Sequence, residues 1–539
     1  MSDKPWSAGG LTVAIGGGSL SAAAETALSR ANESGLAAAL AGKDATVWGP
    51  EATPEASIRL GWLDVVEPGR SLVPQILTLR DELRADGVDR VVLCGMGGSS
   101  LAPEVICGTA GVPLVVVDTT DPGQVRSALV ELERTVVVVS SKSGGTIETD
   151  SHRRAARAAF EAAGIDPAQR LVVVTDPGSP FEQASTSEGT RAVFLADPNV
   201  GGRYSALTAF GLVPAGLAGV DIGGLLDEAA AIADSLSSDN GPAMALGAVL
   251  GGGAMAGRDK LVLVTTAGLV GFGDWAEQLV AESTGKQGKG LLPIVVESPD
   301  APGTEPSADS HLVVVGVGDV ATPPAGTAVT GPLGAQFLAW EYATAAVGWA
   351  LQINPFDQPN VQESKDNTGA ILSGAPSPVR EPLFAEAGIE VHASGDLLGD
   401  VTTLTGAFEA LLAAVPDRGY LAVMAYLDRQ ADAEAEQLRS LLAARLAHPV
   451  TFGWAPRFLH STGQFHKGGP QTGVFLQVTG AVAEDLEIPG RDFTFGTLQA
   501  AQALGDLRAL GSRDRPVLAL HLTDRAQSLR TLLAAAGGL

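Results

Sequence analysis

The segment TVVVVSSKSGGTIETDSHRRAARAAF, residues 135–160, joins an apolar run to a helix-like stretch through a turn of hydroxyl and glycine residues. A continuous β-branched run is typical of a strand buried on both faces of a parallel sheet. We predict a strand that ends at Ser140, a tight turn, and a helix that opens between Thr146 and Thr149. This segment is therefore a β-α unit, and it indicates an α/β fold.

The same rhythm recurs along the chain, because apolar runs alternate with alanine-rich stretches. The other runs span 91–97, 113–118, 171–176, 261–266, 291–296, 311–318, 420–426, 474–479 and 517–522. We predict two doubly wound parallel-sheet subdomains with helical N-terminal and C-terminal extensions. The expected parts are a mainly helical segment (1–85), a first subdomain (86–255), a second subdomain (256–384) and a C-terminal α/β region that completes the second lobe (385–539).

Composition narrows the class of protein. A net charge of −26 repels nucleic acid and anionic lipid, so we expect neither as a partner. No apolar run reaches the roughly 18 to 20 residues that cross a bilayer, and the first residues lack the pattern of a secretion signal. Cys94 and Cys107 form no disulfide framework, which favours a reducing compartment. We expect a cytoplasmic protein with buried structural thiols.

The turn SSKSGGTIET has the groups of a phosphate cradle. A strand-to-helix turn leaves backbone N–H groups unpaired at the helix N-terminus, where the helix dipole favours an anion. Ser141, Ser143 and Thr146 add hydroxyl donors, while Lys142 either adds charge or points outward. An ordinary capped β-α turn is the plainer interpretation, and the spacing is not that of a nucleotide P-loop.

A second turn strengthens the phosphate interpretation. CGMGGSSLAPE, residues 94–104, is another glycine-rich loop that closes on serines after an apolar run. Loops at neighbouring parallel strand ends face the same crevice, where open α/β sheets bind ligands. The two loops together predict a site for a phosphorylated small molecule.

Five motifs in order resemble those of the phosphoglucose isomerases, which are built from sugar isomerase (SIS) domains of flavodoxin-like type. They are GMGGSSLAP (95–103), SSKSGGTIET (140–149), NVGGRYSALTAFGL (199–212), AEQLVAESTGK (276–286) and NPFDQPNVQESK (354–365). The segments 458–480 and 493–506 resemble the isomerase half of transaldolase–phosphoglucose isomerase fusions. No transaldolase half is recognisable in the sequence.

The resemblance implies a role for each matching residue. Glu282 would be the base that carries a proton between C2 and C1 of the sugar, and Arg203 would stabilise the enediolate. Gln278, one helical turn before Glu282, would hydrogen-bond the substrate hydroxyls. The remaining substrate contacts would come from Gly98, Ser99, Ser141, Lys142, Ser143, Thr146 and Gly202. A carboxylate base and a fixed cation suffice for this chemistry, so no cofactor is expected.

The sequence departs from the family where the ring-opening histidine and a C-terminal lysine are usual. Tyr342 and Gln499 stand at those places, and a tyrosine with a pKa near 10 is a poor base at neutral pH. We predict that His466 opens the ring with help from Lys467, and we rank His460 below them. Each could equally be an ordinary loop residue.

The resemblance implies reversible isomerisation of glucose 6-phosphate and fructose 6-phosphate through a cis-enediol. A variant that also accepts mannose 6-phosphate and a non-catalytic sugar-phosphate sensor remain open alternatives. The seven histidines are scattered without metal-ligand spacing, so we expect no metal. The family resemblance also implies a homodimer that binds a phosphorylated hexose.

Overall fold

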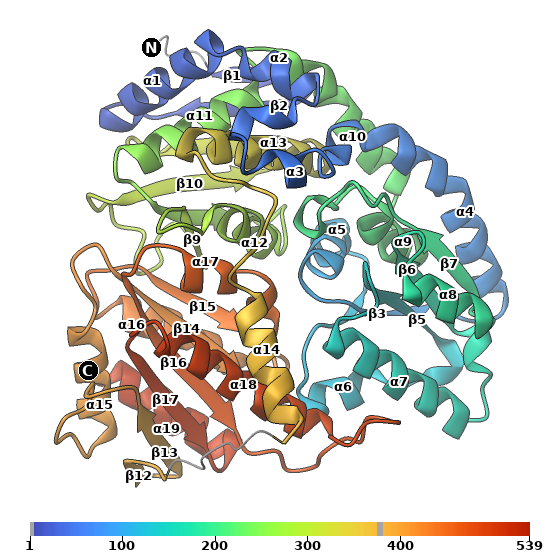
Figure 1. The fold of residues 1–539 in the computed structure, drawn as a ribbon, viewed down its shortest axis with the longest axis vertical. Coiled ribbons are helices and arrows are strands. Elements are labelled where there is room, and N and C mark those ends of the chain that lie inside the picture. The colour runs from blue at the N-terminus through green and yellow to red at the C-terminus, as the bar shows by residue number, and fades with distance from the viewer. Residues whose placement is uncertain (1–4, 375–380) are drawn as a thin grey trace.

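A computed structural model describes residues 5–374 and 381–539 of the chain. Three β-sheets with surrounding helices make up these residues, one in each of three α/β units (Figure 1). The first and second units lie side by side, and the C-terminal unit packs beneath the second in this view. The predicted α/β class with parallel sheets is confirmed.

The first sheet is parallel throughout and has the strand order β4-β3-β5-β6-β7. Its strands are β3 (Arg90–Cys94), β4 (Val115–Val117), β5 (Thr135–Ser140), β6 (Leu171–Thr175) and β7 (Ala192–Leu195). Its helices are α5 (Leu101–Ala110), α6 (Pro122–Ala128), α7 (Ile147–Ala162), α8 (Pro180–Ser187) and α9 (Ala209–Ala218). Numbered along the chain, the strand order is 2-1-3-4-5, which is the flavodoxin-like arrangement that the sequence predicted.

Both faces of the first sheet are buried, which explains its uninterrupted apolar strands. Val136 and Val138 face one hydrophobic core, whereas Val137 and Val139 face another. Successive strand side chains point to opposite faces, so burying both faces requires apolar residues at every position. The valine-rich run of β5 meets this requirement.

The second sheet has the order β1-β2-β11-β10-β8-β9. Its strands are β1 (Trp6–Ala8), β2 (Leu11–Ile15), β8 (Lys260–Thr265), β9 (Leu292–Val296), β10 (Ser310–Gly316) and β11 (Thr327–Thr330). Its helices are α1 (Ser19–Glu33), α2 (Leu36–Ala41), α10 (Ile222–Ala233), α11 (Pro242–Met255), α12 (Phe272–Thr284) and α13 (Leu333–Leu351). The four later strands are parallel and repeat the order of the first sheet.

The N-terminal segment is mainly helical, but it begins with two short strands that the sequence analysis did not predict. β1 and β2 form an antiparallel hairpin, and β2 pairs with β11 to extend the second sheet. The helices α3 (Thr53–Ala56) and α4 (Val66–Ala85) follow, and α4 runs along the outside of the first unit (Figure 1). Strands this short carry little apolar periodicity, so the sequence pattern did not reveal them.

The C-terminal region forms a third sheet, whereas we predicted that it completes the second lobe. Its order is β12-β13-β17-β16-β14-β15. The strands are β12 (Phe384–Glu386), β13 (Ile389–Ala393), β14 (Tyr420–Tyr426), β15 (Val450–Trp454), β16 (Gly473–Gly480) and β17 (Val517–Leu522). Its apolar runs pair with one another, and one face of this sheet packs on the second sheet through a shared core that includes Val262, Ile294 and Met424.

The C-terminal region also contains helices. They are α14 (Gln362–Leu372), α15 (Leu404–Ala413), α16 (Gln437–Ala443), α17 (Gly463–Gly468), α18 (Phe495–Gly511) and α19 (Arg525–Gly537). α14 and α18 pack against each other (Figure 1). Phe495 and Leu498 of α18 enter the core of the first sheet. In the part of the chain that the structure describes, no helix is both long and apolar enough to cross a membrane.

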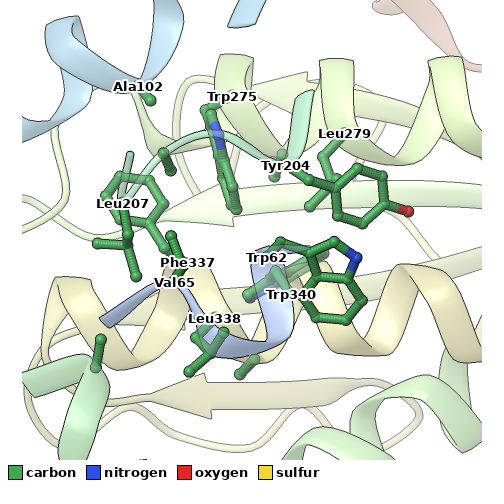
Figure 2. Packing of buried hydrophobic residues seen from close by; sticks show 14 of the residues in the cluster. Trp62, Val65, Ala102, Tyr204, Leu207, Trp275, Leu279, Phe337, Leu338 and Trp340 are labelled. Atoms are coloured by element: carbon green, nitrogen blue, oxygen red, sulfur yellow. The ribbon is translucent and has the colours of Figure 1, made fainter. Parts of the chain in front are cut away.

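An aromatic core supports the motif that contains Arg203. Tyr204 packs against Trp62 with ring centroids 5.3 Å apart, and both side chains are buried. Trp275 and Phe337 make an edge contact at 4.6 Å nearby (Figure 2). These rings come from the N-terminal segment and from both units, so the backbone around Arg203 is held where the units meet.

Candidate active site

Two glycine-rich loops open at the same edge of the first sheet. β3 and β5 are neighbouring parallel strands, with Cys94 beside Val139, so the loops that follow them leave from adjacent carboxyl ends. β4 lies on one side of β3 and β5 on the other. Open α/β sheets bind ligands at such a switch point. The loops that the sequence singled out therefore leave the sheet at the same edge.

The loop after β5 is folded by its own serines. Ser141 Oγ accepts a hydrogen bond from the Gly144 N–H at 3.1 Å. Ser143 Oγ accepts one from the Gly145 N–H at 3.1 Å. Thr146 stands at the N-terminus of α7 and its side chain makes no capping hydrogen bond. The start of α7 thus combines helix N–H groups with hydroxyl groups, which is a favourable setting for an anion.

Lys142 belongs to the same loop but is engaged elsewhere. Its Nζ donates to Asp176 Oδ1 at 3.0 Å and to the Val200 carbonyl at 2.8 Å. These partners follow β6 and β7, so the ammonium ties three strand-end loops together. Of the two alternatives that the sequence left open, the structure supports a lysine directed away from the helix N-terminus.

The loop after β3 lies against three segments that are distant in sequence. A Cβ atom at Gly98 would lie 2.0 Å from the Gly202 carbonyl oxygen, so only glycine fits there. Gly97 has a φ of +57°, and a Cβ atom on it would lie 2.7 Å from Gln278 Nε2 and 2.8 Å from the His460 carbonyl oxygen. The glycines therefore permit the backbone to approach the residues of the candidate site.

A carboxylate, an amide and a guanidinium meet beside this loop. Gln278 and Glu282 are one turn apart on α12, and Gln278 Nε2 donates to Glu282 Oε2 at 3.1 Å and to the His460 carbonyl at 2.7 Å. Arg203 Nη1 lies 3.5 Å from Glu282 Oε1. The side chains of Arg203 and Glu282 are only 5% and 8% exposed. Ser99, in the same loop as Gly98, is half-buried.

Arg203 is held by acceptors that leave its position little freedom. Its Nε donates to Ser283 Oγ at 2.8 Å. Its Nη2 donates to the carbonyls of Pro355 and Asp357 at 3.0 and 2.9 Å, and its Nη1 donates to Gln358 Oε1 at 3.2 Å. The NPFDQ motif therefore serves as a cradle for the guanidinium.

Lys286 fixes the same cradle from the other side, a role that the sequence analysis missed. Its Nζ donates to the Asn354 carbonyl at 2.7 Å and to the carbonyl of Asp357 at 2.6 Å. Burial lowers the pKa of Lys286 to about 8, with the neighbouring Arg203 charge acting in the same direction. The lysine of the AESTGK motif thus supports Arg203 through the loop rather than by direct contact.

His460 enters the site from the C-terminal region. Its Nε2 lies 3.0 Å from Glu148 Oε1, and the same oxygen accepts a hydrogen bond from Gln502 Nε2 at 2.7 Å. Burial raises the pKa of Glu148, but the charge and hydrogen bond of His460 outweigh it and lower the pKa to about 2. The sequence analysis ranked His460 low and gave no role to Glu148 or Gln502, although Glu148 stands in the phosphate-loop motif.

His466 and Lys467, which we predicted at the site, lie instead in the core of the C-terminal unit. His466 Nδ1 is 3.0 Å from the Tyr420 hydroxyl, and the two rings stack. Burial and the charges of Lys467 and Arg515 lower the pKa of His466 well below its ordinary value. Lys467 Nζ lies 2.7 Å from Asp506 Oδ1, with both side chains 1% exposed. His466 therefore packs α17 against the C-terminal sheet, and Lys467 holds α17 to α18.

The residues that replace the family's histidine and lysine also lie away from Glu282. Tyr342 is fully buried within α13, and burial raises its pKa. Gln499 lies on α18 and lines a cavity beside the C-terminal sheet. Neither residue is hydrogen-bonded to the site residues in the described chain.

A buried arginine joins the three units next to the site. Arg457 contacts Glu104 of the first unit at 2.8 Å, Asp118 after β4 at 3.4 Å, and Asp274 of α12 at 3.5 Å. Burial lowers the pKa of Arg457, but these carboxylates outweigh it and raise the pKa above its ordinary value. Arg457 immediately precedes the turn that ends at His460, so this cluster helps to set the position of His460.

Residues 5–374 and 381–539 contain no group of three or more His, Cys, Asp and Glu side chains placed to hold a metal ion. Both cysteines are buried, and burial raises the pKa of each thiol to about 12. They are therefore protonated at neutral pH and have the character of structural residues.

Part of the candidate site lies in a segment that is similar to known proteins. The sequence profile of the family described as phosphoglucose isomerase matches residues 82–289. That segment is similar to the phosphoglucose isomerase family, and the match covers less than half of the chain. It contains both glycine-rich loops, Arg203, Gln278 and Glu282, whereas the NPFDQ cradle, His460 and Gln502 lie beyond it.

Individual phosphoglucose isomerase relatives cover the same part of the chain. A probable glucose-6-phosphate isomerase of Haloarcula marismortui is 36% identical over 213 residues, which are 38% of this chain and 49% of the relative. A glucose-6-phosphate isomerase of Rippkaea orientalis is 34% identical over 239 residues, or 42% and 45% of the two chains. The chain thus spans about half the length of these curated relatives.

Similarity of fold extends further than similarity of sequence. The crystal structure of a glucose-6-phosphate isomerase from Chlamydia trachomatis superimposes with a TM-score of 0.54 at 18% identity, over 68% of this chain and 89% of that one. The phosphoglucose isomerase fold therefore covers more of the chain than the family match does.

Proposed function

We propose that the protein is a glucose-6-phosphate isomerase that interconverts glucose 6-phosphate and fructose 6-phosphate. The observation that carries the proposal is the placement of Glu282 between Gln278 and Arg203, beside the two loops at the switch point of the first sheet. A carboxylate next to a fixed cation at an anion-binding edge suits proton transfer on a phosphorylated sugar.

The proposed reaction moves one proton between neighbouring carbons. Glu282 removes the proton from C2, the C2–H electrons form the C1=C2 bond, and the C1=O electrons move onto O1 to give an enediolate. The O2–H proton passes to O1. Glu282 then returns the proton to C1 as the carbonyl forms at C2. Arg203 stabilises the negative charge that develops on oxygen, because a guanidinium stays protonated at any working pH. No electron leaves the substrate, so the proposed reaction needs no redox cofactor.

Substrate binding follows from the loops. We assign the phosphate to the hydroxyls of Ser99, Ser141, Ser143 and Thr146 and to the N-terminus of α7. Gln278 is assigned to the sugar hydroxyls. Gly202 leaves room for the substrate, since a Cβ atom there would meet nothing within 4 Å, and Gly98 lets its loop approach Gly202. Lys142 is assigned a supporting role through its contacts with Asp176 and Val200.

For ring opening we propose His460 in place of His466. The imidazole can give a proton to the ring oxygen while the anomeric hydroxyl loses one, since its ordinary pKa lies near neutrality. Its Nε2 lies 3.0 Å from Glu148 Oε1, a contact that fixes the orientation of the ring. The buried His466 and the Lys467–Asp506 ion pair are assigned to packing.

The decisive experiment is coupled turnover of fructose 6-phosphate with Glu282→Gln beside Glu277→Gln. Glu277 precedes Gln278 on the same helix, and burial and the nearby Asp274 raise its pKa well above the ordinary value, so its neutral carboxyl resembles an amide. We expect Glu282→Gln to lower kcat by about 10²-fold or more and Glu277→Gln to retain activity. An inactive wild type that still binds sugar phosphate would contradict the proposed activity.

The homodimer implied by the family resemblance remains a prediction. Sedimentation equilibrium of the full chain tests it, and a single species at the monomer mass at micromolar concentration would contradict it.

A further inference from the structure

A cavity of about 990 Å³ lies between the C-terminal sheet and α18, outside the site described above. Alternate residues of four neighbouring strands form one wall: Glu390, His392, Tyr426, Gln477, Thr479, Ala519 and His521. One side of α18 forms the other wall, with Gln499, Ala500, Ala503, Leu504 and Leu507. We call this cavity the α18 hollow. Its volume is in the upper part of the range for small-molecule sites, about 300–1,000 Å³.

Two buried polar groups in the α18 hollow have no hydrogen-bond partner. They are the Tyr426 hydroxyl and Gln499 Nε2, whose residues are 1% and 4% exposed, and no partner for either occurs among the described residues. Gln477, by contrast, donates to the Ala503 carbonyl at 3.0 Å. A buried group without a partner costs about 1–3 kcal/mol. The hollow therefore offers two hydrogen-bonding groups that the protein itself does not use.

Both groups can act as donors to a ligand. Burial raises the pKa of Tyr426 well above its ordinary value, so the hydroxyl stays protonated. The amide nitrogen of Gln499 is a donor only. Ligand atoms that accept hydrogen bonds, such as a ring nitrogen or a carbonyl oxygen, would satisfy them.

The charge of the α18 hollow differs from that of the phosphate loops. Its ionisable lining consists of Glu390, His392, Arg508 and His521. Burial lowers the pKa of His521, so that ring is neutral near pH 7. One carboxylate and one guanidinium then remain beside two histidines, with no cluster of cations in the lining. Gly496, at the N-terminus of α18, also lines the cavity, but its N–H donates to Asp485 Oδ1 at 2.8 Å. This balance suits an uncharged ligand and disfavours a sugar phosphate.

The apolar lining is made mainly of small side chains. Ala500 and Ala503 on the helix oppose Ala519 and Gly480 on the sheet, with Val517 at one end. Small residues on two facing walls leave a flat space, which fits a planar ring better than a branched aliphatic chain. Ala500 and Ser512 at the rim are exposed, so the space is accessible to solvent.

Neither Glu282 nor Arg203 lines the α18 hollow, so the hollow is distinct from the proposed active site, although residues of α18 adjoin both. Gln502 of α18 donates to Glu148 at 2.7 Å, and Asp506 of α18 pairs with Lys467. These four residues do not line the hollow either. A ligand in the hollow would therefore not contact Glu282 or Arg203.

We propose that the α18 hollow binds a neutral heteroaromatic molecule of nucleobase or nucleoside size, which accepts hydrogen bonds from Tyr426 and Gln499. This assignment does not depend on the isomerase activity, because it rests on a different cavity and is tested by binding alone.

Titration calorimetry of the full chain with adenosine, guanosine, uridine and nicotinamide tests the proposal. We expect saturable binding of at least one compound with a Kd between micromolar and millimolar. Ala500→Trp should abolish it by filling the hollow. Ala413→Trp, an exposed position of α15 beside the other face of the same sheet, should not.

Variants of Tyr426 and Gln499 test the two proposed hydrogen bonds to the ligand. Tyr426→Phe and Gln499→Leu should each weaken binding by about 5- to 20-fold, the loss of one hydrogen bond. Tyr426→Phe should not lower the melting temperature, since it removes a hydroxyl that has no partner in the free protein.

Three outcomes would overturn the assignment. The first is that none of the four compounds binds at millimolar concentration. The second is binding that survives Ala500→Trp. The third is self-association in sedimentation experiments that Ala500→Trp abolishes and Ala413→Trp does not, because a second copy of the chain would then cover the hollow.

Discussion

The first unit and the C-terminal unit contribute to the same site in different ways. The first unit supplies contiguous loops, in which Ser141 and Thr146 lie within a few residues of one another. The C-terminal unit supplies isolated side chains, His460 and Gln502, which converge on Glu148. Local loops leave a motif in the sequence, whereas convergent side chains leave only single residues. The experiments below test whether the two units are equally necessary and whether His460 has been assigned correctly.

The largest effect is expected where the first two units meet, at Arg203. Arg203→Met keeps the length of the side chain but removes the charge and the donors held by the NPFDQ cradle. We expect kcat to fall by about 10²–10³-fold, as for the loss of a preorganised electrostatic donor. The substitution also removes the hydrogen bonds of the guanidinium and its contact with Glu282. Circular dichroism and thermal unfolding must therefore show that the variant is folded. A folded variant with wild-type kcat would remove Arg203 from the mechanism.

The second-largest loss of turnover is expected for a variant of His460, and none is expected for a variant of His466. His460→Phe should slow turnover of the cyclic substrate by about 10- to 100-fold, less than a full general acid–base contribution because ring opening also occurs in water. His466→Phe should leave kcat unchanged while lowering stability by about 1–2 kcal/mol, since the Tyr420 hydroxyl loses its partner.

Stopped-flow measurements with the two histidine variants distinguish these outcomes. Loss of turnover in His466→Phe alone would reverse the assignment and restore the sequence prediction. Loss in neither variant would mean that the enzyme acts on substrate that opens in solution.

Much of the fold could be predicted because buried parallel strands have a plain signature. β14 and β17 coincide with the apolar runs 420–426 and 517–522. β5 likewise matches its predicted run, and the flavodoxin-like order of the first sheet is what the family resemblance implies. β15 and β7 were missed, since VTFGW and AVFL are too short or too interrupted by glycine to stand out.

The part of the site that could be predicted is the part built from local motifs. Ser141, Arg203 and Glu282 lie within recognisable stretches, and the structure brings their loops together. His460 and His466 are six residues apart in one segment, and no periodicity distinguishes them. Their positions in the structure differ because His460 contacts Glu148, whereas His466 contacts Tyr420.

The buried Lys467–Asp506 pair should affect stability without affecting chemistry. Lys467→Met leaves an uncompensated carboxylate in the core, so we expect a loss of about 3–5 kcal/mol in the free energy of unfolding. Chemical denaturation measures this loss, while kcat of the folded fraction should remain at the wild-type value. A double variant, Lys467→Met with Asp506→Leu, should recover part of the stability. A fall in kcat at constant stability would instead return Lys467 to the site.

The smallest expected effect is a pH dependence that originates at Glu148. Its pKa is about 2 in the folded protein against an ordinary value of 4.5, so its contribution is present above pH 4.5 and is lost as the pH falls toward 2. Denaturant unfolding at pH 6 should therefore show Glu148→Gln less stable than the wild type by on the order of 2 kcal/mol. At pH 3 the difference should be smaller, because the wild type has by then lost part of this contribution. A difference that stays constant between these pH values would mean that the His460–Glu148 contact does not depend on the charge of the carboxylate.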